Sequence, residues 1–234
     1  NCDILSIDNL SRKSSVFNIN KLNENEIKNI KIDLSSKKAF SQINEKFDFI
    51  IDCCAEPAVE VAKYNRNLVF NSNLRSTLNI LEKAKNDNSK IIYLSTDYVY
   101  PGTDGNYKET DTMKPFTKYG WSKLGGECAV QMYDNHLILR LAMNKKPFPH
   151  PKALADMKKS LMWIDDVAKV IPQLLDESGI VNVGGKSQTV FDFVKEFNPD
   201  VDKIYLSDIG DVNMATDCSM DTTKLNEIID DTII

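Results

Sequence analysis

Short apolar runs recur along the chain and are separated by longer stretches of mixed polarity. The runs at 47–55, 91–95 and 136–141 are almost continuously apolar, which is typical of parallel strands buried on both faces. Three shorter runs that end near turn-forming residues are predicted to be further strands: 2–7, 30–33 and 179–183.

Helical periodicity fills several of the intervals between these runs. Apolar residues recur at spacings of three and four over 71–85, which predicts a helix with one buried face. Residues 117–133 and 163–175 are predicted to be two more helices, and Pro172 is expected to kink or end the second one. Strands that alternate with helices favour an α/β fold with a mostly parallel, doubly wound sheet. A Pro-rich stretch at 146–151 is expected to introduce a smaller C-terminal portion.

Composition and charge narrow the functional classes. The 234 residues are 42% hydrophobic and 27% charged, which suits one large domain or a domain and a half. Lys and Arg number 29 against 34 Asp and Glu, a net charge of -5 without a strongly basic block, so nucleic-acid binding is not expected. No apolar run approaches the roughly 20 residues of a membrane span, and the first residues do not resemble a signal peptide.

Cysteine and histidine content argues against a metal or disulfide framework. The chain has five cysteines and no CxxC pair, which indicates reduced thiols and a cytoplasmic protein. With two histidines, a His-rich metal site is not expected, so no metal is predicted.

Candidate chemistry begins with two side chains on one predicted helix. Tyr119 and Lys123 are four residues apart and therefore project from the same helical face. A phenol near an ammonium loses its proton more easily and can serve as an acid or base, although so short a motif also occurs by chance. Thr96 directly follows an apolar strand, where its hydroxyl could hold a substrate carbonyl near that phenol.

These residues belong to a longer ordered pattern: STDYVY at 95–100, YKE at 107–109 and YGWSKLGGE at 119–127. This pattern resembles the extended short-chain dehydrogenase/reductase family, and within it the dTDP-4-dehydrorhamnose reductase branch. Further segments that resemble the family in the same order are 53–55, 73–81, 163–168 and 182–185, so the resemblance covers nearly the whole chain.

The resemblance implies an α/β fold: a Rossmann-like, doubly wound parallel sheet with a small C-terminal substrate-binding portion. Residues 1–142 would form the NAD(P)-binding domain and 143–234 the mixed C-terminal portion, with 163–183 returning to the Rossmann core. The family opens with a strand and a GxxGxxG loop that cradles the dinucleotide pyrophosphate. Because this sequence has no such loop, the N-terminal strand and Gly-rich loop are expected to be missing from an incomplete N-terminus.

The resemblance also implies residue roles. Tyr119 would transfer a proton at the sugar oxygen, Lys123 would lower the Tyr119 pKa and bind the nicotinamide ribose, and Thr96 would orient the substrate oxygen. Asp97 and Tyr98 are expected to contact the sugar.

The cofactor is expected to be NAD, with NADP possible. A carboxylate at Asp8 would accept bonds from the adenine-ribose hydroxyls and repel a 2′-phosphate, whereas Arg12 nearby weakens that preference. The predicted cofactor-binding residues are Asp8, Asn9, Ser11, Arg12, Asp33, Leu34, Cys53, Cys54, Ala55, Asn73, Ser95, Tyr119 and Lys123.

Several functions stay open. Reduction of a 4-keto nucleotide sugar is favoured, but the segment at 8–13 is similar to DNLSRKG of NAD-dependent nucleotide-sugar epimerases. A dehydratase ranks lowest because an acidic pair is expected beside Thr96, where this chain has Asp97-Tyr98. A catalytically silent relative that binds a nucleotide or a partner is the alternative from another class. Family members often form homodimers through helices such as those predicted at 71–85 and 117–133.

Overall fold

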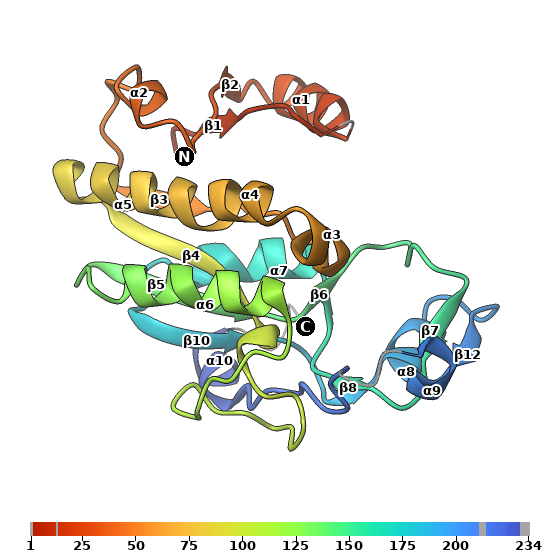
Figure 1. Ribbon diagram of the computed structural model, residues 1–234. Coiled ribbons are helices and arrows are strands. Elements are labelled where there is room, and N and C mark those ends of the chain that lie inside the picture. The colour runs from red at the N-terminus through yellow and green to blue at the C-terminus, as the bar shows by residue number, and fades with distance from the viewer. Residues whose placement is uncertain (1, 13, 211–213, 230–234) are drawn as a thin grey trace.

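A four-stranded parallel sheet forms the centre of the computed structural model, which describes residues 2–12, 14–210 and 214–229 (Figure 1). The strand order is β10-β5-β4-β3. These strands span Phe49–Asp52 (β3), Lys90–Thr96 (β4), His136–Leu141 (β5) and Gly179–Val183 (β10). The α/β class and the parallel sheet predicted from the apolar runs are therefore confirmed.

Helices cover both faces of this sheet. On one face lie α5 (Ser76–Asp87) and α6 (Lys118–Val130), and on the other lie α7 (Ile164–Val170) and α10 (Thr223–Ile228). Ile91 of β4 belongs to the core under α5 and α6, whereas its neighbour Ile92 belongs to the core under α7 and α10. Because both faces are buried, successive strand residues are apolar, which explains the near-continuous runs.

The N-terminal strands form a separate sheet. Strands β1 (Leu5–Asp8) and β2 (Lys28–Lys31) pair in parallel and are connected by α1 (Ser15–Glu24). Within the described residues neither strand pairs with β3, whose Phe49 and Ile51 are 43% and 45% exposed. Strand β3 is therefore an edge of the main sheet, and the small sheet lies beyond it at the top of Figure 1. Lys13, part of the epimerase-like segment, lies outside the described residues.

The helix predicted at 71–85 begins with an irregular turn. Phe70–Arg75 is a π-helix (η1) that runs directly into α5. Short helices α2 (Lys37–Phe40), α3 (Val59–Tyr64) and α4 (Arg66–Val69) precede it. The π-helix turns Asn73 into the protein, where the side chain is fully buried. As expected, the helix that contains Pro172 changes character, because α7 ends at Val170 and a 3-10 turn (η3, Ile171–Leu174) follows.

The C-terminal portion alternates between a small lobe and the main sheet. Its short strands pair as β6 with β9, β7 with β12, and β8 with β11. These strands span Met143–Asn144 (β6), Lys152–Leu154 (β7), Lys158–Lys159 (β8), Met162–Trp163 (β9), Gln188–Thr189 (β11) and Asp202–Ile204 (β12). Helices α8 (Val190–Lys195) and α9 (Leu206–Ile209) complete the lobe, on the right of Figure 1.

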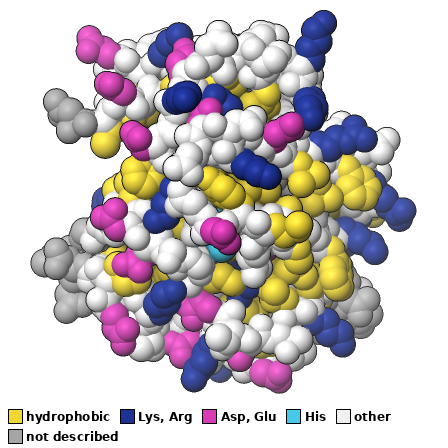
Figure 2. Space-filling model, turned by 90° about the vertical axis from the view of Figure 1, so that its left-hand side faces the viewer, with side chains coloured by type: hydrophobic (Ala, Val, Ile, Leu, Met, Phe, Trp, Pro, Cys, Tyr) yellow, Lys and Arg dark blue, Asp and Glu magenta, His cyan; other side chains and the backbone are white. Residues whose placement is uncertain are grey.

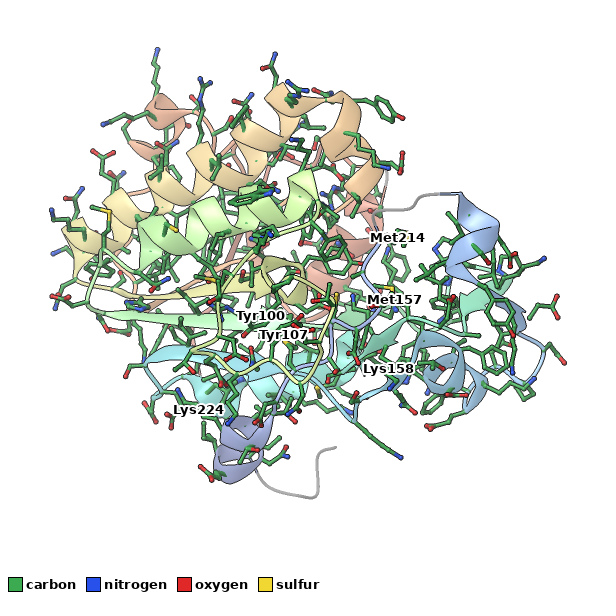
Figure 3. All side chains as sticks on the ribbon, turned by 60° about the horizontal axis from the view of Figure 1, so that its bottom comes forward. Tyr100, Tyr107, Met157, Lys158, Met214 and Lys224 are labelled. Carbon is green, nitrogen blue, oxygen red and sulfur yellow. The ribbon has the colours of Figure 1, made fainter. Side chains whose placement is uncertain are left out.

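Residues 215–221, here called the C-terminal strap, lie between the 102–108 loop and strand β8. Backbone hydrogen bonds run from Thr216 to Gly102 (2.9 Å), from Cys218 to Lys158 (2.9 Å) and from Tyr107 to Ser219 (3.0 Å). Figure 3 shows Tyr107 beside Tyr100, with Met157 and Lys158 farther toward the lobe. The strap therefore ties the loop after β4 to the lobe.

Charges of both signs are interspersed with apolar patches on the face shown in Figure 2. Among the described residues, no helix combines the length and apolar character required to cross a bilayer.

Candidate active site

The carboxyl end of β4 presents Thr96. Its hydroxyl donates to the Asp97 Oδ1 atom at 3.1 Å and accepts the Tyr98 backbone N–H at 3.3 Å. The second bond caps the 3-10 turn η2 (Asp97–Val99), which carries the chain away from the sheet. Thr96 is left at the edge where open α/β sheets bind their ligands.

Helix α6 brings the predicted Tyr119 and Lys123 to the same edge. Thr117 caps the helix by accepting the Gly120 N–H at 2.9 Å. A Cβ atom on Gly120 would lie 2.3 Å from the Tyr98 carbonyl oxygen, and one on Gly126 would lie 2.1 Å from the Tyr93 hydroxyl. These two glycines therefore allow α6 to lie directly against β4 and η2.

The Tyr119 hydroxyl lies within hydrogen-bonding reach of the Thr96 hydroxyl. Its half-buried ring is edge-on to Tyr98, with 6.4 Å between the ring centroids. Burial raises the pKa of Tyr119 to about 12; the Asp97 carboxylate adds to this rise, whereas the Thr96 hydrogen bond and the Lys159 charge oppose it. The phenol is therefore protonated at neutral pH.

The expected effect of Lys123 on Tyr119 requires correction, because desolvation raises the pKa of Tyr119 and the ammonium is directed elsewhere. The Lys123 Nζ atom lies 4.0 Å from the centroid of the Tyr93 ring. Burial lowers the pKa of Lys123, and the nearby Asp52 carboxylate opposes that fall. Asp52 is the last residue of β3, so the Lys123 amine lies under the strand end that carries Cys53 and Cys54.

A second buried lysine occupies the position beside the catalytic candidates. Lys159, from strand β8, places its Nζ atom 2.8 Å from Asp97 Oδ2 and 4.2 Å from the centroid of the Tyr98 ring. The Lys159 and Asp97 side chains are 13% and 3% exposed. Burial alone would lower the pKa of Lys159, but the Asp97 carboxylate outweighs it and raises that pKa. Asp97, expected to contact the sugar, is thus buried and bound by Thr96 and Lys159.

Comparison with known proteins identifies the family. A model described as "RmlD substrate binding domain" matches residues 10–144. The chain belongs to the RmlD family.

Among curated relatives of this RmlD-family chain, a dTDP-4-dehydrorhamnose reductase from Aggregatibacter actinomycetemcomitans is 35% identical over 168 residues, covering 62% of this chain and 56% of the relative. Methionine adenosyltransferase 2 subunit beta from Bos taurus is 35% identical over 81 residues, covering 35% of this chain and 24% of that protein. The chain thus matches about half of the length of that reductase and about a quarter of the methionine adenosyltransferase subunit. A crystal structure of the Bacillus anthracis dTDP-4-dehydrorhamnose reductase in complex with NADP shares the fold, with a TM-score of 0.78, 21% identity, and coverage of 95% of this chain and 90% of that one.

The predicted adenosine-side residues of this RmlD-family chain lie at the ends of β1 and β2. The Asp8 carboxylate accepts the Leu10 N–H at 2.5 Å, and the Asn9 side chain accepts the Ser11 N–H at 3.0 Å. Asp8, Asn9 and Ser11 are exposed, whereas Leu10 is half-buried. Asp33 accepts bonds from the Ser35 backbone and hydroxyl, and Leu34 is buried.

Arg12 connects the small sheet to the main sheet. Its guanidinium donates to the Ala55 carbonyl oxygen at 2.5 Å and lies 3.5 Å from the Glu56 carboxylate. The predicted cofactor residues of β1 and β3 are therefore brought together. Cys53 is exposed at the end of β3 and Cys54 is half-buried.

Asn73 and Ser95, also predicted to bind the cofactor, are part of the supporting framework. The Asn73 side chain accepts the Glu56 N–H at 2.6 Å and donates to the Ser122 hydroxyl at 2.9 Å, which links the loop after β3 to α6. Ser95 is 5% exposed and donates to Glu127 at 2.5 Å, so its hydroxyl is engaged inside the protein.

Two features of the site were not predicted from the sequence. Glu127 and Arg140 form a fully buried ion pair at 2.9 Å beneath Ser95, and a lone Arg within an apolar strand was the available signal. Lys159 carried no such signal, because adjacent lysines usually lie on a solvated surface.

Proposed function

We propose that the protein is an NAD(P)H-dependent reductase that acts on a 4-keto nucleotide sugar, with Tyr119 as the proton donor. The observation that carries this proposal is the meeting of the Tyr119 phenol with the Thr96 hydroxyl at the carboxyl end of β4. The similarity to a dTDP-4-dehydrorhamnose reductase supports a dTDP sugar as the substrate. We place the cofactor against residues 1–142, and the sugar between Thr96 and Tyr119 of that domain and the C-terminal portion at 143–234.

The protonation state of Tyr119 bears on whether reduction or epimerisation is the first step. Tyr119 gives its phenolic proton to the substrate carbonyl oxygen beside Thr96, whose own hydroxyl proton is directed to Asp97 Oδ1. Reduction needs the neutral phenol, and burial, which raises the pKa of Tyr119 to about 12, keeps the phenol neutral. An epimerase starts by taking a proton from a sugar hydroxyl and needs the phenolate. The site in this state therefore favours reduction.

The residues at the strand ends fit a dinucleotide, which would supply the hydride. Small side chains occupy 53–55 at the end of β3, with Cys53 exposed and the Lys123 side chain buried beneath. Asp8 is exposed at the end of β1 to receive a ribose, while Arg12 is turned toward Ala55. These contacts support NAD and leave NADP open; the chain itself contains no GxxGxxG sequence to bind the pyrophosphate.

The proton role is tested with Tyr119→Phe. We expect kcat for reduction of a dTDP-4-keto sugar by NADH or NADPH to fall by about 10²- to 10⁴-fold, the usual contribution of a positioned acid. Tyr64→Phe is the matched control, because it makes the same change at a tyrosine that is 84% exposed at the end of α3. Wild-type turnover in Tyr119→Phe would refute the assignment.

Cofactor placement is tested by thiol footprinting. Cys2, Cys53 and Cys128 are exposed, so a Cys2→Ser/Cys128→Ser variant leaves Cys53 as the exposed thiol among the described residues. Saturating NADH or NADPH should slow alkylation of Cys53, followed by mass spectrometry. An unchanged rate with both nucleotides would show that neither covers the end of β3.

A second candidate is a partner-binding subunit without turnover, suggested by the similarity to a methionine adenosyltransferase subunit. Absence of reduction, oxidation and epimerisation in the wild type, together with retained nucleotide binding by calorimetry, would favour it.

The proposal includes a homodimer. Phe70 of η1, Leu78 of α5 and Trp121 of α6 are 53%, 54% and 53% exposed on the elements expected to form the interface. Sedimentation of the wild type and of Leu78→Glu tests this association, which the charge should weaken.

The cysteines among the described residues are free, which supports the proposed cytoplasmic location.

A further inference from the structure

Lys159 reaches the proposed active site from a distant part of the chain. Its strand β8 pairs with β11, and Lys158 is held to the C-terminal strap by two backbone hydrogen bonds of 2.9 Å, with Thr216 and Cys218. Figure 3 shows Lys158 at the junction between the sheet and the lobe. The lobe and strap therefore fix the backbone from which the Lys159 ammonium extends to Asp97.

We propose that Lys159 is a positioning residue for proton donation by Tyr119: its ammonium neutralises Asp97 and holds this carboxylate against Thr96. The proposal rests on the proposed reductase function. It follows from the 2.8 Å ion pair, the 4.2 Å distance to the Tyr98 ring, and the 3.1 Å bond between Thr96 and Asp97. Lys159 acts through these residues and does not itself contact the substrate.

The reason lies in the charge that the reaction leaves behind. The O–H bond of Tyr119 breaks, its proton joins the oxygen of the former carbonyl, and the carbon receives the hydride with its electron pair. A phenolate then remains at Tyr119 until water returns a proton. Asp97 disfavours this phenolate and Lys159 favours it. An unpaired Asp97 would therefore oppose proton donation, whereas the ion pair presents little net charge.

The groups facing Lys159 come from three elements. Asp97 and Tyr98 belong to η2, Tyr119 to α6 and Cys218 to the strap. Burial raises the pKa of Cys218. The Lys159 charge lowers the pKa of Tyr98, but burial and the Asp97 carboxylate together outweigh it and raise that pKa, so both groups are neutral at the pH of the assay. Burial also raises the pKa of Asp97, and the Lys159 ammonium opposes that rise, so Asp97 is the carboxylate whose charge Lys159 balances.

The kinetic test compares Lys159→Met, Lys159→Arg and Asp97→Asn/Lys159→Met. We expect Lys159→Met to lower kcat for reduction about tenfold or more, with KM unchanged within threefold, because an unpaired charge lies near the phenol. Lys159→Arg, which keeps the positive charge, should stay within about threefold of wild type, and the double variant, in which no charge is unbalanced, should recover much of the kcat lost in Lys159→Met. Wild-type kcat in Lys159→Met, or a double variant as slow as Lys159→Met, would overturn the proposal.

Oxidation of the product alcohol separates this role from a structural one. The rate of oxidation increases with the fraction of Tyr119 that is phenolate. Lys159→Met should therefore shift this increase to higher pH, and the double variant should shift it back toward the wild-type pH. A structural defect would lower the rate equally at every pH, and that result would also overturn the proposal.

A measurement without turnover keeps the two proposals distinguishable. Tyrosine is labelled with ¹³C at the ring carbon that bears the hydroxyl, and the Tyr119 resonance is assigned by its loss in Tyr119→Phe. The proton dissociation constant of Tyr119 should be at least about tenfold higher in Asp97→Asn/Lys159→Arg than in Asp97→Asn/Lys159→Met. Equal dissociation constants in the two double variants would overturn the proposed role of Lys159. A tenfold difference between them, together with a wild-type protein that reduces no 4-keto sugar, would overturn the reductase assignment alone.

Discussion

Replacing Glu127 by Ala is expected to destabilise the fold strongly, because it leaves a buried guanidinium without its counter-ion. Arg140 contacts both carboxylate oxygens of Glu127, with its Nε atom at 3.1 Å from Oε1 and a terminal nitrogen at 2.9 Å from Oε2. Neither side chain is exposed. After the substitution, Arg140 keeps neutral partners, the Tyr100 hydroxyl at 2.8 Å and the Glu109 carbonyl at 3.0 Å.

The magnitude follows from this burial. Removing one member of a buried pair costs about 3–5 kcal/mol. The lost bond from the Ser95 hydroxyl adds about 1 kcal/mol. Since domains of this kind have a free energy of unfolding of about 5–15 kcal/mol, the variant should lose a large share of its stability.

The assay is urea unfolding followed by circular dichroism, with Glu82→Ala as the control. The Glu82–Lys37 pair has the same 2.9 Å separation, but its side chains are 52% and 77% exposed. That pair should contribute less than about 1 kcal/mol. Equal losses in the two variants would refute the reasoning. Glu127→Leu/Arg140→Met should recover much of the stability, because no buried charge is left unpaired.

Three further predictions concern packing and protonation. Gly126→Ala should lower the free energy of unfolding by about 1–3 kcal/mol, because its Cβ would lie 2.1 Å from the Tyr93 hydroxyl. Gly125→Ala, which meets a movable Leu74 methyl at 2.9 Å, should be neutral or stabilising in the same urea titration. Asn73→Ala should cost about 1–3 kcal/mol, since the Glu56 N–H loses its buried acceptor; a loss below 0.5 kcal/mol would contradict this role. The rate of reduction should not decline through ionisation of Tyr119 between pH 7 and 10, because its pKa of about 12 keeps the proton donor protonated. A decline in that range that depends on Tyr119 would contradict the raised pKa.

Much of the fold was predictable because burial on two faces leaves a clear mark on a strand. The predicted strand at 136–141 coincides with β5, and 91–95 lies within β4. The π-helix at Phe70–Arg75 was not predicted, since its extra residue per turn hardly changes the apolar spacing. The burial of Asn73 depends on that turn.

The candidate site was predictable where it is local in sequence. Tyr119 and Lys123 share a helical face, as expected, but they lie one helical turn apart and therefore have different neighbours. Lys123 therefore lies near Asp52, while Tyr119 lies near Asp97. The role of Lys159 could not be predicted, because its burial is created by the strap more than 50 residues further along the chain.

The route of the strap also determines when the site can form during synthesis. Asn106 donates its backbone N–H to the Ser219 hydroxyl, a contact that spans 113 residues. Chain closure over such a separation is slow compared with the local pairing of neighbouring elements. On the ribosome, β4 and α6 can assemble well before residues 215–221 have left the exit tunnel. The nascent protein therefore passes through a stage in which the Thr96 and Tyr119 hydroxyls are already in place, while the segment that holds β8 against them has yet to be translated.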